Sequence, residues 1–174
     1  MGISISTVED SDIHKILEIQ TKCNLSEWTA EDYQKEITRD DSIILAAKIG
    51  GETVGFLTAR FAMVNQLAGD QVEYREQVEY AELDILNFGV FREFQKQGVG
   101  NLLFEHLLNT LTAVRLETIW LEVRESNLDA ISFYKKRGFT AIQTRKNFYR
   151  QPLENALVMK LEQRTATRKF FNKT

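Results

Sequence analysis

Residues 95–100 read Gln95-Lys96-Gln97-Gly98-Val99-Gly100, and they connect an apolar run that ends at Val90 to a helical pattern that begins at Val99. Glycines at the start of a helix let several backbone N–H groups point into one small space, in front of the positive end of the helix dipole. Such a turn is an anion cradle that suits a pyrophosphate. The same residues also fit a plain strand-to-helix turn with a glycine cap. A Walker A loop and a Rossmann fingerprint both fit poorly, because no Lys-Ser/Thr follows Gly100 and Leu103 stands where a third glycine would.

Apolar patterns on either side of this segment predict two strands joined by a helix. Residues 80–90 form a long strand-like run, in which Gly89 suggests a bulge or the close approach of another group. Residues 118–124 are apolar on both faces, which is typical of a strand inside a sheet. Between them, apolar residues at helical spacing predict a helix from Val99 to about residue 114. This order of elements predicts one parallel crossover between the two strands.

The remaining elements complete a mixed sheet covered by helices. One helix follows residues 9–11, and a second follows Thr29, whose spacing to Asp32 resembles a capping box. The pair Gly50-Gly51 favours a tight antiparallel hairpin. A last helix runs from Asn127 to Arg137, and the final strands are expected at 139–144 and 156–161. The predicted order is β-α-α-β-β-β-α-β-α-β-β, which is α/β in the broad sense, with a mostly antiparallel sheet.

The composition indicates one soluble globular domain. A length of 174 residues suits a single domain, for which we expect residues 1–162. Residues 163–174 carry basic side chains and no acidic ones, and form either a helix or a solvated arm. The net charge of −3 and a pI near 5.5 argue against nucleic-acid binding.

Other function classes are excluded by what the chain lacks. A single cysteine, Cys23, cannot form an internal disulfide, and it has no histidine and acid arranged to make it a nucleophile. Two histidines and one cysteine leave little for a transition-metal site. No run approaches the roughly 20 apolar residues of a membrane span, and the N-terminus does not resemble a signal peptide. A cytoplasmic protein without a metal is therefore expected.

Together with the order of elements, the pattern Gln-x-x-Gly-x-Gly at 95–100 resembles the GNAT family, the GCN5-related N-acetyltransferases, over residues 3–161. Further segments are similar to the branch that acetylates the N-terminal alanine of a small-subunit ribosomal protein. They are Ser26-Glu27-Trp28-Thr29, Trp120-Leu121-Glu122-Val123-Arg124-Glu125-Ser126-Asn127, Ala130-Ile131-Ser132-Phe133-Tyr134, Arg137-Gly138-Phe139 and Arg145-Lys146-Asn147-Phe148-Tyr149.

The resemblance implies acetyl-CoA as co-substrate and a GNAT fold in which one parallel strand pair splays apart. The backbone of the splayed strand would then pair with the pantetheine arm as an added strand. The implied cofactor-binding residues are Phe88, Gly89, Val90, Gln95, Lys96, Gln97, Gly98, Val99, Gly100, Asn101 and Asn127.

The resemblance also implies that Glu122 is the general base and Tyr134 the general acid. A free α-amine has a pKa of about 7.7–8.0, so Glu122 would face a modest task with such an acceptor. A tyrosine with a pKa of about 10 can protonate a departing thiolate. On spacing alone, Glu122 also fits a half-exposed carboxylate on a sheet face, and Tyr134 a core aromatic on an amphipathic helix.

Two regions bear on the acceptor. Trp28 and Tyr33 are placed to form a hydrophobic staple around Thr29, and the branch uses the neighbouring loop for its peptide groove, which makes both residues candidates for substrate binding. Residues 64–80 form an acidic insertion relative to the branch, either a solvated hairpin or an acidic rim that attracts a basic peptide.

The leading hypothesis is an acetyl-CoA-dependent N-acetyltransferase that acts on a protein N-terminus by direct transfer. A GNAT enzyme for a small amine (a polyamine, an amino acid or an antibiotic) and a non-catalytic acyl-CoA-binding module are the alternatives. The expected partners are acetyl-CoA and either a protein N-terminus, with that of a ribosomal protein as one candidate, or a small amine. The chain is expected to act as a monomer or homodimer without a membrane or nucleic acid.

Overall fold

The computed structural model describes residues 2–63, 81–113 and 116–162. The predicted hairpin or rim at 64–80 and the basic tail at 163–174 lie outside the described residues. The division into a domain at 1–162 and a tail therefore stays a prediction. Within the described residues, the order of strands and helices is the predicted one. No described helix has the length and apolar character needed to cross a membrane.

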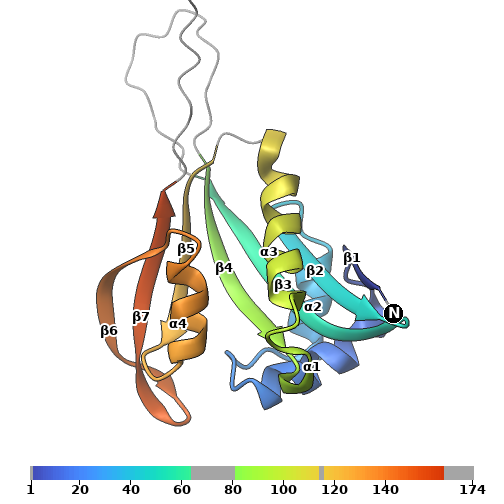
Figure 1. Ribbon diagram of the computed structural model, residues 1–174, viewed down its shortest axis with the longest axis horizontal. Helices are drawn as coiled ribbons and strands as arrows, with labels where there is room; N and C mark the ends of the chain where they lie inside the picture. The colour runs from blue at the N-terminus through green and yellow to red at the C-terminus, as the bar shows by residue number, and fades with distance from the viewer. Residues whose placement is uncertain (1, 64–80, 114–115, 163–174) are drawn as a thin grey trace, which may run out of the picture.

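The described strands form one mixed sheet in the order β1-β2-β3-β4-β5-β7-β6 (Figure 1). Neighbouring strands run antiparallel except β4 and β5, which are parallel. This is the parallel crossover that the sequence predicted. The strands are β1 (Ile3–Thr7), β2 (Ser42–Ile49), β3 (Glu52–Met63), β4 (Ala81–Val90), β5 (Leu116–Arg124), β6 (Thr140–Arg150) and β7 (Leu153–Glu162).

Helices cover both faces of the sheet. The helices α3 (Val99–Thr110) and α4 (Leu128–Lys135) lie in front of the sheet in Figure 1, and α1 (Ile13–Lys22) and α2 (Ala30–Ile37) lie behind it. Leu103 and Leu107 of α3 and Ile131 of α4 join the larger buried cluster. The apolar side chains of α1 pack into a second cluster, which includes Phe56 of β3 on the opposite face. We refer to the face of the sheet that carries the larger cluster as the α3–α4 face, and to the face that carries the second cluster as the α1–α2 face.

The β2–β3 turn forms as predicted, because Gly50 and Gly51 both have positive φ, at 60° and 88°. The last two strands are much longer than the sequence suggests. β6 is an edge strand whose residues from 140 to 147 are all exposed, so its sequence shows no alternation of apolar and polar residues. The last helix is two residues shorter than expected and ends at Lys135, before the left-handed Gly138.

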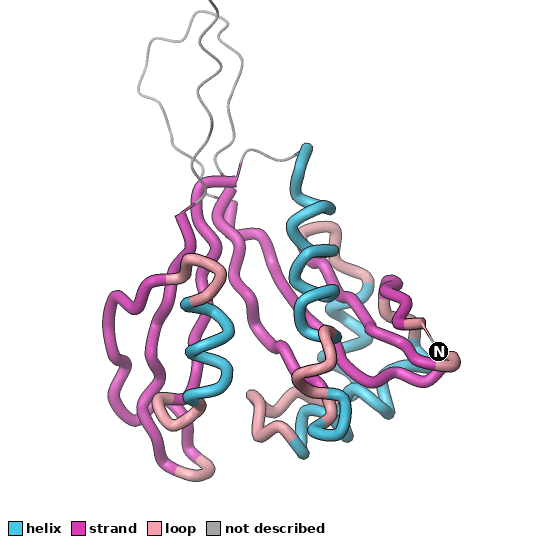
Figure 2. The backbone as a smooth tube through the Cα atoms, in the orientation of Figure 1, coloured by secondary structure: helices cyan, strands magenta, loops and turns pink. Residues whose placement is uncertain are grey.

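The parallel strands β4 and β5 separate part-way along their length. They pair from Ala81 and Leu116 up to Ile85 and Leu121, and no further. Beyond that point β4 stays paired with β3 as far as Val90, and β5 stays paired with β7 as far as Arg124. Figure 2 shows the two strands side by side at one end and apart at the other. We call this opening the fork, with residues 86–90 as its β4 arm and 122–124 as its β5 arm.

Gly89 lies in the β4 arm, where another group approaches closely, as predicted. A Cβ at Gly89 would lie 2.8 Å from Ile19 Cγ2 and 2.9 Å from Leu25 Cδ1. The bulge lies three residues earlier than Gly89. Asn87 pairs with Thr58 and Ile85 with Ala59, which leaves Leu86 as the extra residue of β4. The bulge therefore coincides with the point where the two strands separate.

Candidate active site

Residues 95–101, which we call the cradle, form the turn between β4 and α3. The Gln95 side chain donates to Val90 O at 2.9 Å, and the Gln97 side chain donates to Glu93 O at 2.6 Å. Both side-chain amides therefore brace the turn, and the groups they leave for a ligand belong to the backbone. Lys96 and Gly98 have positive φ, at 59° and 93°. Such a backbone turns successive N–H groups toward one side, which favours an anion.

The N-terminus of α3 is open to a ligand. The first backbone bond of the helix runs from Leu102 N to Gly98 O at 3.0 Å, which leaves the amides of Val99, Gly100 and Asn101 without helical partners. No side chain caps Gly98, and a Cβ there would meet nothing within 4 Å. The positive end of the helix dipole, bare amides and open space fit a pyrophosphate.

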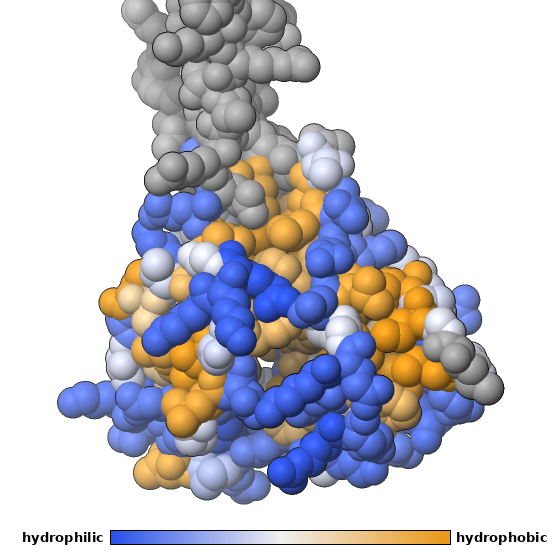
Figure 3. Space-filling view, viewed as in Figure 1, coloured by the Kyte–Doolittle hydropathy of each residue, from blue (hydrophilic) through white to orange (hydrophobic). Residues whose placement is uncertain are grey.

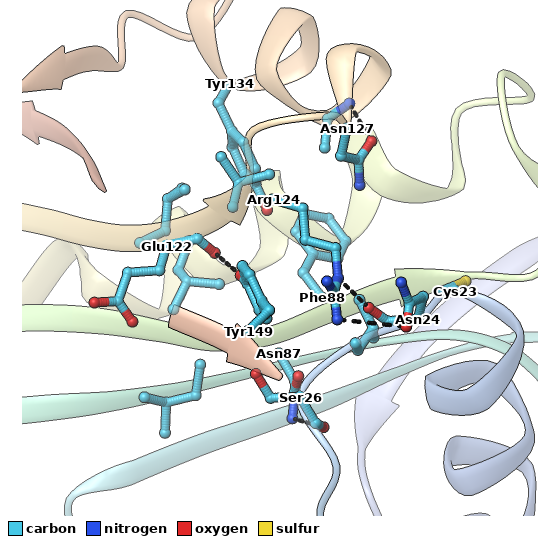
Figure 4. A pocket seen from close by; sticks show the side chains of 16 residues that line it. Cys23, Asn24, Ser26, Asn87, Phe88, Glu122, Arg124, Asn127, Tyr134 and Tyr149 are labelled. Atoms are coloured by element: carbon cyan, nitrogen blue, oxygen red, sulfur yellow. Dashed lines mark hydrogen bonds between the residues drawn. The ribbon is translucent and has the colours of Figure 1, made fainter. Parts of the chain in front are cut away.

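Next to the cradle, a pocket fills the fork (Figure 4). It is lined by residues 85–88 of β4, 121–124 of β5, Asn127 and Tyr134 from the α4 region, and residues 23–26 after α1. In the space-filling view of the α3–α4 face, a hollow rimmed by hydrophilic side chains lies between the two helices (Figure 3). The structure therefore brings to one pocket four of the residues that the resemblance assigned to cofactor binding or catalysis, namely Phe88, Glu122, Asn127 and Tyr134.

Tyr134 reaches this pocket from α4 on the α3–α4 face. Its side chain is 7% exposed and packs among the rings of Phe133 and Phe139, with centroid distances of 5.4 Å to each. Burial raises the pKa of Tyr134 well above its usual value. The hydroxyl is therefore protonated at neutral pH and has a proton to donate.

Glu122 lies on the other face of the sheet, on the β5 arm. Leu121 and Val123 belong to the cluster on the α3–α4 face, so the alternating Glu122 points toward the α1–α2 face. Its carboxylate is paired with Arg145 of β6. Its backbone carbonyl accepts a hydrogen bond from the Tyr149 hydroxyl at 3.3 Å. Glu122 and Tyr134 thus approach the fork from opposite faces.

Comparison with known proteins identifies this arrangement. The Acetyltransferase (GNAT) family model matches residues 13–139. The chain belongs to the GNAT family. The enzyme is therefore an N-acetyltransferase whose acetyl donor is acetyl-CoA, and the open cradle and fork fit that donor.

Individual relatives agree with the family. The ribosomal protein bS18-alanine N-acetyltransferase of Haemophilus ducreyi is 30% identical over 169 residues, which cover 90% of this chain and 98% of that protein. The Escherichia coli enzyme of the same name is 28% identical over 160 residues, covering 91% and 96%.

Solved structures share the GNAT fold. The crystal structure of the E. coli ribosomal-protein-S18-alanine N-acetyltransferase matches with a TM-score of 0.75 and 24% identity, over 98% of this chain and 99% of that one. Arabidopsis thaliana NAA60, crystallised with acetyl-CoA, matches with a TM-score of 0.77 and 20% identity, over 92% and 98%.

A second cavity opens on the α1–α2 face of this GNAT domain. We call it the carboxylate groove. It measures about 520 Å³ and continues from the fork, since Glu122 and Tyr149 line both spaces. Its lining includes Ser26, Trp28, Glu82, Asp84, Trp120, Glu122, Gln143, Arg145, Phe148 and Tyr149.

Asp84 is a groove carboxylate whose ionisation is affected by its surroundings. Burial, together with the charges of Glu82 and Glu122, raises the pKa of Asp84. The sequence signal was present but unused: Glu82 and Asp84 alternate with apolar residues in β4, which places both carboxylates on the face of Glu122. Tyr149 was also missed as a site residue, although it belongs to a segment that carried the family resemblance.

Asn127 reaches the fork as the N-cap of α4. Its Oδ1 accepts from Ala130 N at 3.1 Å, which leaves the Nδ2 hydrogens for a ligand in the fork pocket. Lys96 of the cradle forms an exposed ion pair with Asp129 at 3.5 Å, so it reaches toward the same helix.

The predicted capping box and staple are both present. Thr29 accepts from Asp32 N at 3.1 Å, and the rings of Trp28 and Tyr33 lie 5.2 Å apart. Trp28 lines the carboxylate groove. Tyr33, however, is fully buried and donates its hydroxyl to Gln20 Oε1 at 2.8 Å. The expectation that Tyr33 contacts substrate therefore fails, because a residue packed between α1 and the sheet has no surface to offer.

Cys23 makes a structural contact, and among the described residues no histidine or carboxylate is hydrogen-bonded to it that could activate it as a nucleophile. Its thiol donates to Val90 O at 3.3 Å, and burial raises its pKa. A raised pKa keeps the group as a thiol, and the thiol is the unreactive form. Across the described ranges, no three His, Cys, Asp and Glu side chains are grouped to hold a metal ion.

Proposed function

We propose that this protein acetylates the α-amino group at the N-terminus of a protein, with a ribosomal protein that begins with alanine as the first candidate. The observation that carries the proposal is the fork itself. It joins an anion cradle on the α3–α4 face to a groove on the α1–α2 face, with Glu122 at the junction. The curated relatives that cover most of the chain are named for this acceptor.

Binding of the donor relies on backbone groups. The free amides at the start of α3 hold the pyrophosphate, and the unpaired edge of residues 86–90 is available to the pantetheine amides. When bound, acetyl-CoA supplies an acyl group activated as a thioester. The cradle and the β4 arm hold it on one side of the fork, so that much of the rate arises from proximity.

Two side chains move the protons. An α-ammonium group that enters from the carboxylate groove gives its proton to Glu122, directly or through one water. The neutral amine then forms the new C–N bond as the C–S bond breaks. Tyr134 gives its hydroxyl proton to the departing sulfur, and burial has kept that proton on the tyrosine. The nitrogen loses its second proton as the amide forms, and this proton returns through water to the oxygen of Tyr134. Glu122 and Tyr134 thus serve as base and acid on opposite faces.

One observation favours a second candidate, a polyamine acceptor. The carboxylate groove holds Glu82, Asp84 and Glu122, while Arg145 is already paired with Glu122. The excess of negative charge attracts any cationic amine, whether a basic peptide or a small polyamine.

A panel of acceptors separates the two candidates. The purified protein is incubated with acetyl-CoA and peptides that begin with Ala-Arg or Ser, with spermidine, or with free amino acids, and the products are analysed by mass spectrometry. A peptide with a blocked N-terminus and an internal lysine is the control. Acetylation of the free N-terminal peptides and not of the control is expected. Turnover of metabolites alone would overturn the proposal.

A further inference from the structure

Arg124, at the end of the β5 arm, is a buried cation that uses its guanidinium on many acceptors. It is 9% exposed. Its Nε donates to Asn24 O and its Nη2 to Gln151 O, both at 3.0 Å, and its Nη1 donates to Glu154 at 3.2 Å. Longer contacts reach Pro152 O and Asn24 Oδ1 at 3.4 Å. The family resemblance assigned no role to this side chain.

Asn24 is attached to the opposite arm of the fork. The residue before it, Cys23, bonds to Val90 O at the end of the β4 arm. The residue after it, Leu25, packs against Gly89, 2.9 Å from where a Cβ would stand. A bond from Arg124 to Asn24 therefore crosses from the β5 arm to a segment fixed on the β4 arm. Figure 4 shows the guanidinium reaching Asn24 across the pocket.

The same guanidinium also places Tyr149. It lies over the Tyr149 ring at 4.0 Å from the centroid. The Tyr149 hydroxyl in turn donates to the Glu122 carbonyl. Tyr149 lines both the fork pocket and the carboxylate groove, so its ring stands where the two spaces meet.

We infer that Arg124 is a positioning residue for acetyl transfer, which sets the width of the fork on the α1–α2 face and holds Tyr149 at the entrance for the amine. Only a planar group with several donors can bond Asn24, the 151–154 turn and an aromatic face at once. A fold that needed no defined gap here could fill the space with apolar side chains at no cost in stability. The inference holds for any amine acceptor and does not depend on the proposed one.

The test is Arg124→Lys, which keeps the charge and loses the planar fork of donors. We expect the KM of the acceptor to rise about tenfold or more, because small displacements near the reacting groups are costly, while the KM of acetyl-CoA stays within about twofold. Hydrogen exchange should accelerate together at residues 23–28 and 150–155. The acceptor is whichever amine the wild-type enzyme acetylates, so failure of the proposed function leaves this test intact.

Arg39→Lys is the matched control. The Arg39 guanidinium donates to Asp41 through Nε and Nη2, both at 2.7 Å, and Arg39 lines neither the fork pocket nor the carboxylate groove. Its acceptor KM is expected to stay within about threefold of wild type, since the same loss of a planar guanidinium then occurs away from the fork.

Two outcomes would overturn the inference. In one, Arg124→Lys loosens both segments and lowers Tm while the acceptor KM stays unchanged, which would make Arg124 a purely structural residue. In the other, the KM values of donor and acceptor rise equally. If Arg124→Lys does not fold, Tyr149→Leu removes the ring and the bond to Glu122 O and leaves Arg124 in place. A normal acceptor KM in Tyr149→Leu would contradict the role of the held ring.

Discussion

The α3–α4 face of the fork is built mainly from backbone, whereas the α1–α2 face is built from side chains that bond to residues far away in the chain. On the first face, the cradle offers amides set by the positive φ of Lys96 and Gly98. On the second, Arg124 bonds Asn24, one hundred residues earlier, and Glu122 pairs with Arg145 on another strand. A backbone site suits a donor that does not change, while a side-chain site can change with the acceptor.

The largest expected effect tests the α1–α2 face. Glu122→Gln should lower kcat by about 10²–10⁴-fold, because the acceptor then has no base to take its proton. The acetyl-CoA Kd should stay unchanged, since the donor is held on the other face. Steady-state kinetics and calorimetric binding measure the two quantities.

Glu82→Gln is the control for Glu122→Gln, because it removes a carboxylate from the same carboxylate groove on β4. It is expected to reduce kcat far less. Equal losses in the two variants would mean that the charge of the groove matters and that Glu122 has no special place in the reaction.

Tyr134→Phe is expected to lower kcat by about a hundredfold, from the loss of the proton donor. The ring stays in its aromatic cluster, so acetyl-CoA at 100 times its Kd should still stabilise the folded protein by about 2.7 kcal/mol, which is measured as a thermal shift. An unchanged kcat would reject the acid role, and a lost thermal shift would show that the hydroxyl supports binding instead.

The substitution Gly98→Ala tests the α3–α4 face. Both Gly98 and Gly51 have φ near 90°, and a Cβ on either would meet nothing within 4 Å. Alanine at either position should therefore cost about 1–2 kcal/mol of stability through backbone strain. Only Gly98→Ala should also weaken acetyl-CoA binding, by about tenfold or more, since its Cβ enters the space in front of the bare amides. Equal donor Kd values in the two variants would remove the cradle from the site.

This contrast explains which parts were predictable from sequence. The cradle and the capping box at Thr29 and Asp32 are local: a few residues fix the backbone, so their spacing reveals them. The separation of β4 and β5 was predicted only through the family resemblance, because the bulge at Leu86 has no glycine or proline to mark it.

The α1–α2 face was largely hidden for a different reason. Its bonds join residues such as Asn24 and Arg124, whose proximity depends on the whole sheet. Tyr33 was misjudged because a staple residue and a groove residue look alike until burial is known. The strand predicted at 139–144 was shorter than β6, because an edge strand exposed on both faces has no hydrophobic periodicity to mark its end.

A smaller effect concerns the charge of the groove. Asp84→Asn removes one of the carboxylates that face an incoming peptide. The KM of a peptide beginning Ala-Arg is expected to rise about threefold to tenfold at low salt and to approach the wild-type value at high salt, where charges are screened. A peptide beginning Ala-Glu should not lose affinity. A rise of equal size for both peptides would show that Asp84 acts through shape and not through charge.

The smallest effect is the contribution of Asp84 to stability. Its pKa is raised in the folded protein, mainly by burial and further by Glu82 and Glu122. A carboxyl group whose pKa is higher in the folded state stabilises the fold in its protonated form, and that stabilisation is lost as pH rises through the folded-state pKa. Asp84→Asn should therefore be more stable than wild type at pH 7, and the difference should shrink as the pH falls and Asp84 takes up a proton. Thermal unfolding of both proteins from pH 7 downward measures it. A stability difference between the two proteins that stays constant with pH would mean that Asp84 is as easily ionised as an exposed aspartate. The carboxylate groove would then have no effect on the pKa of this carboxyl group.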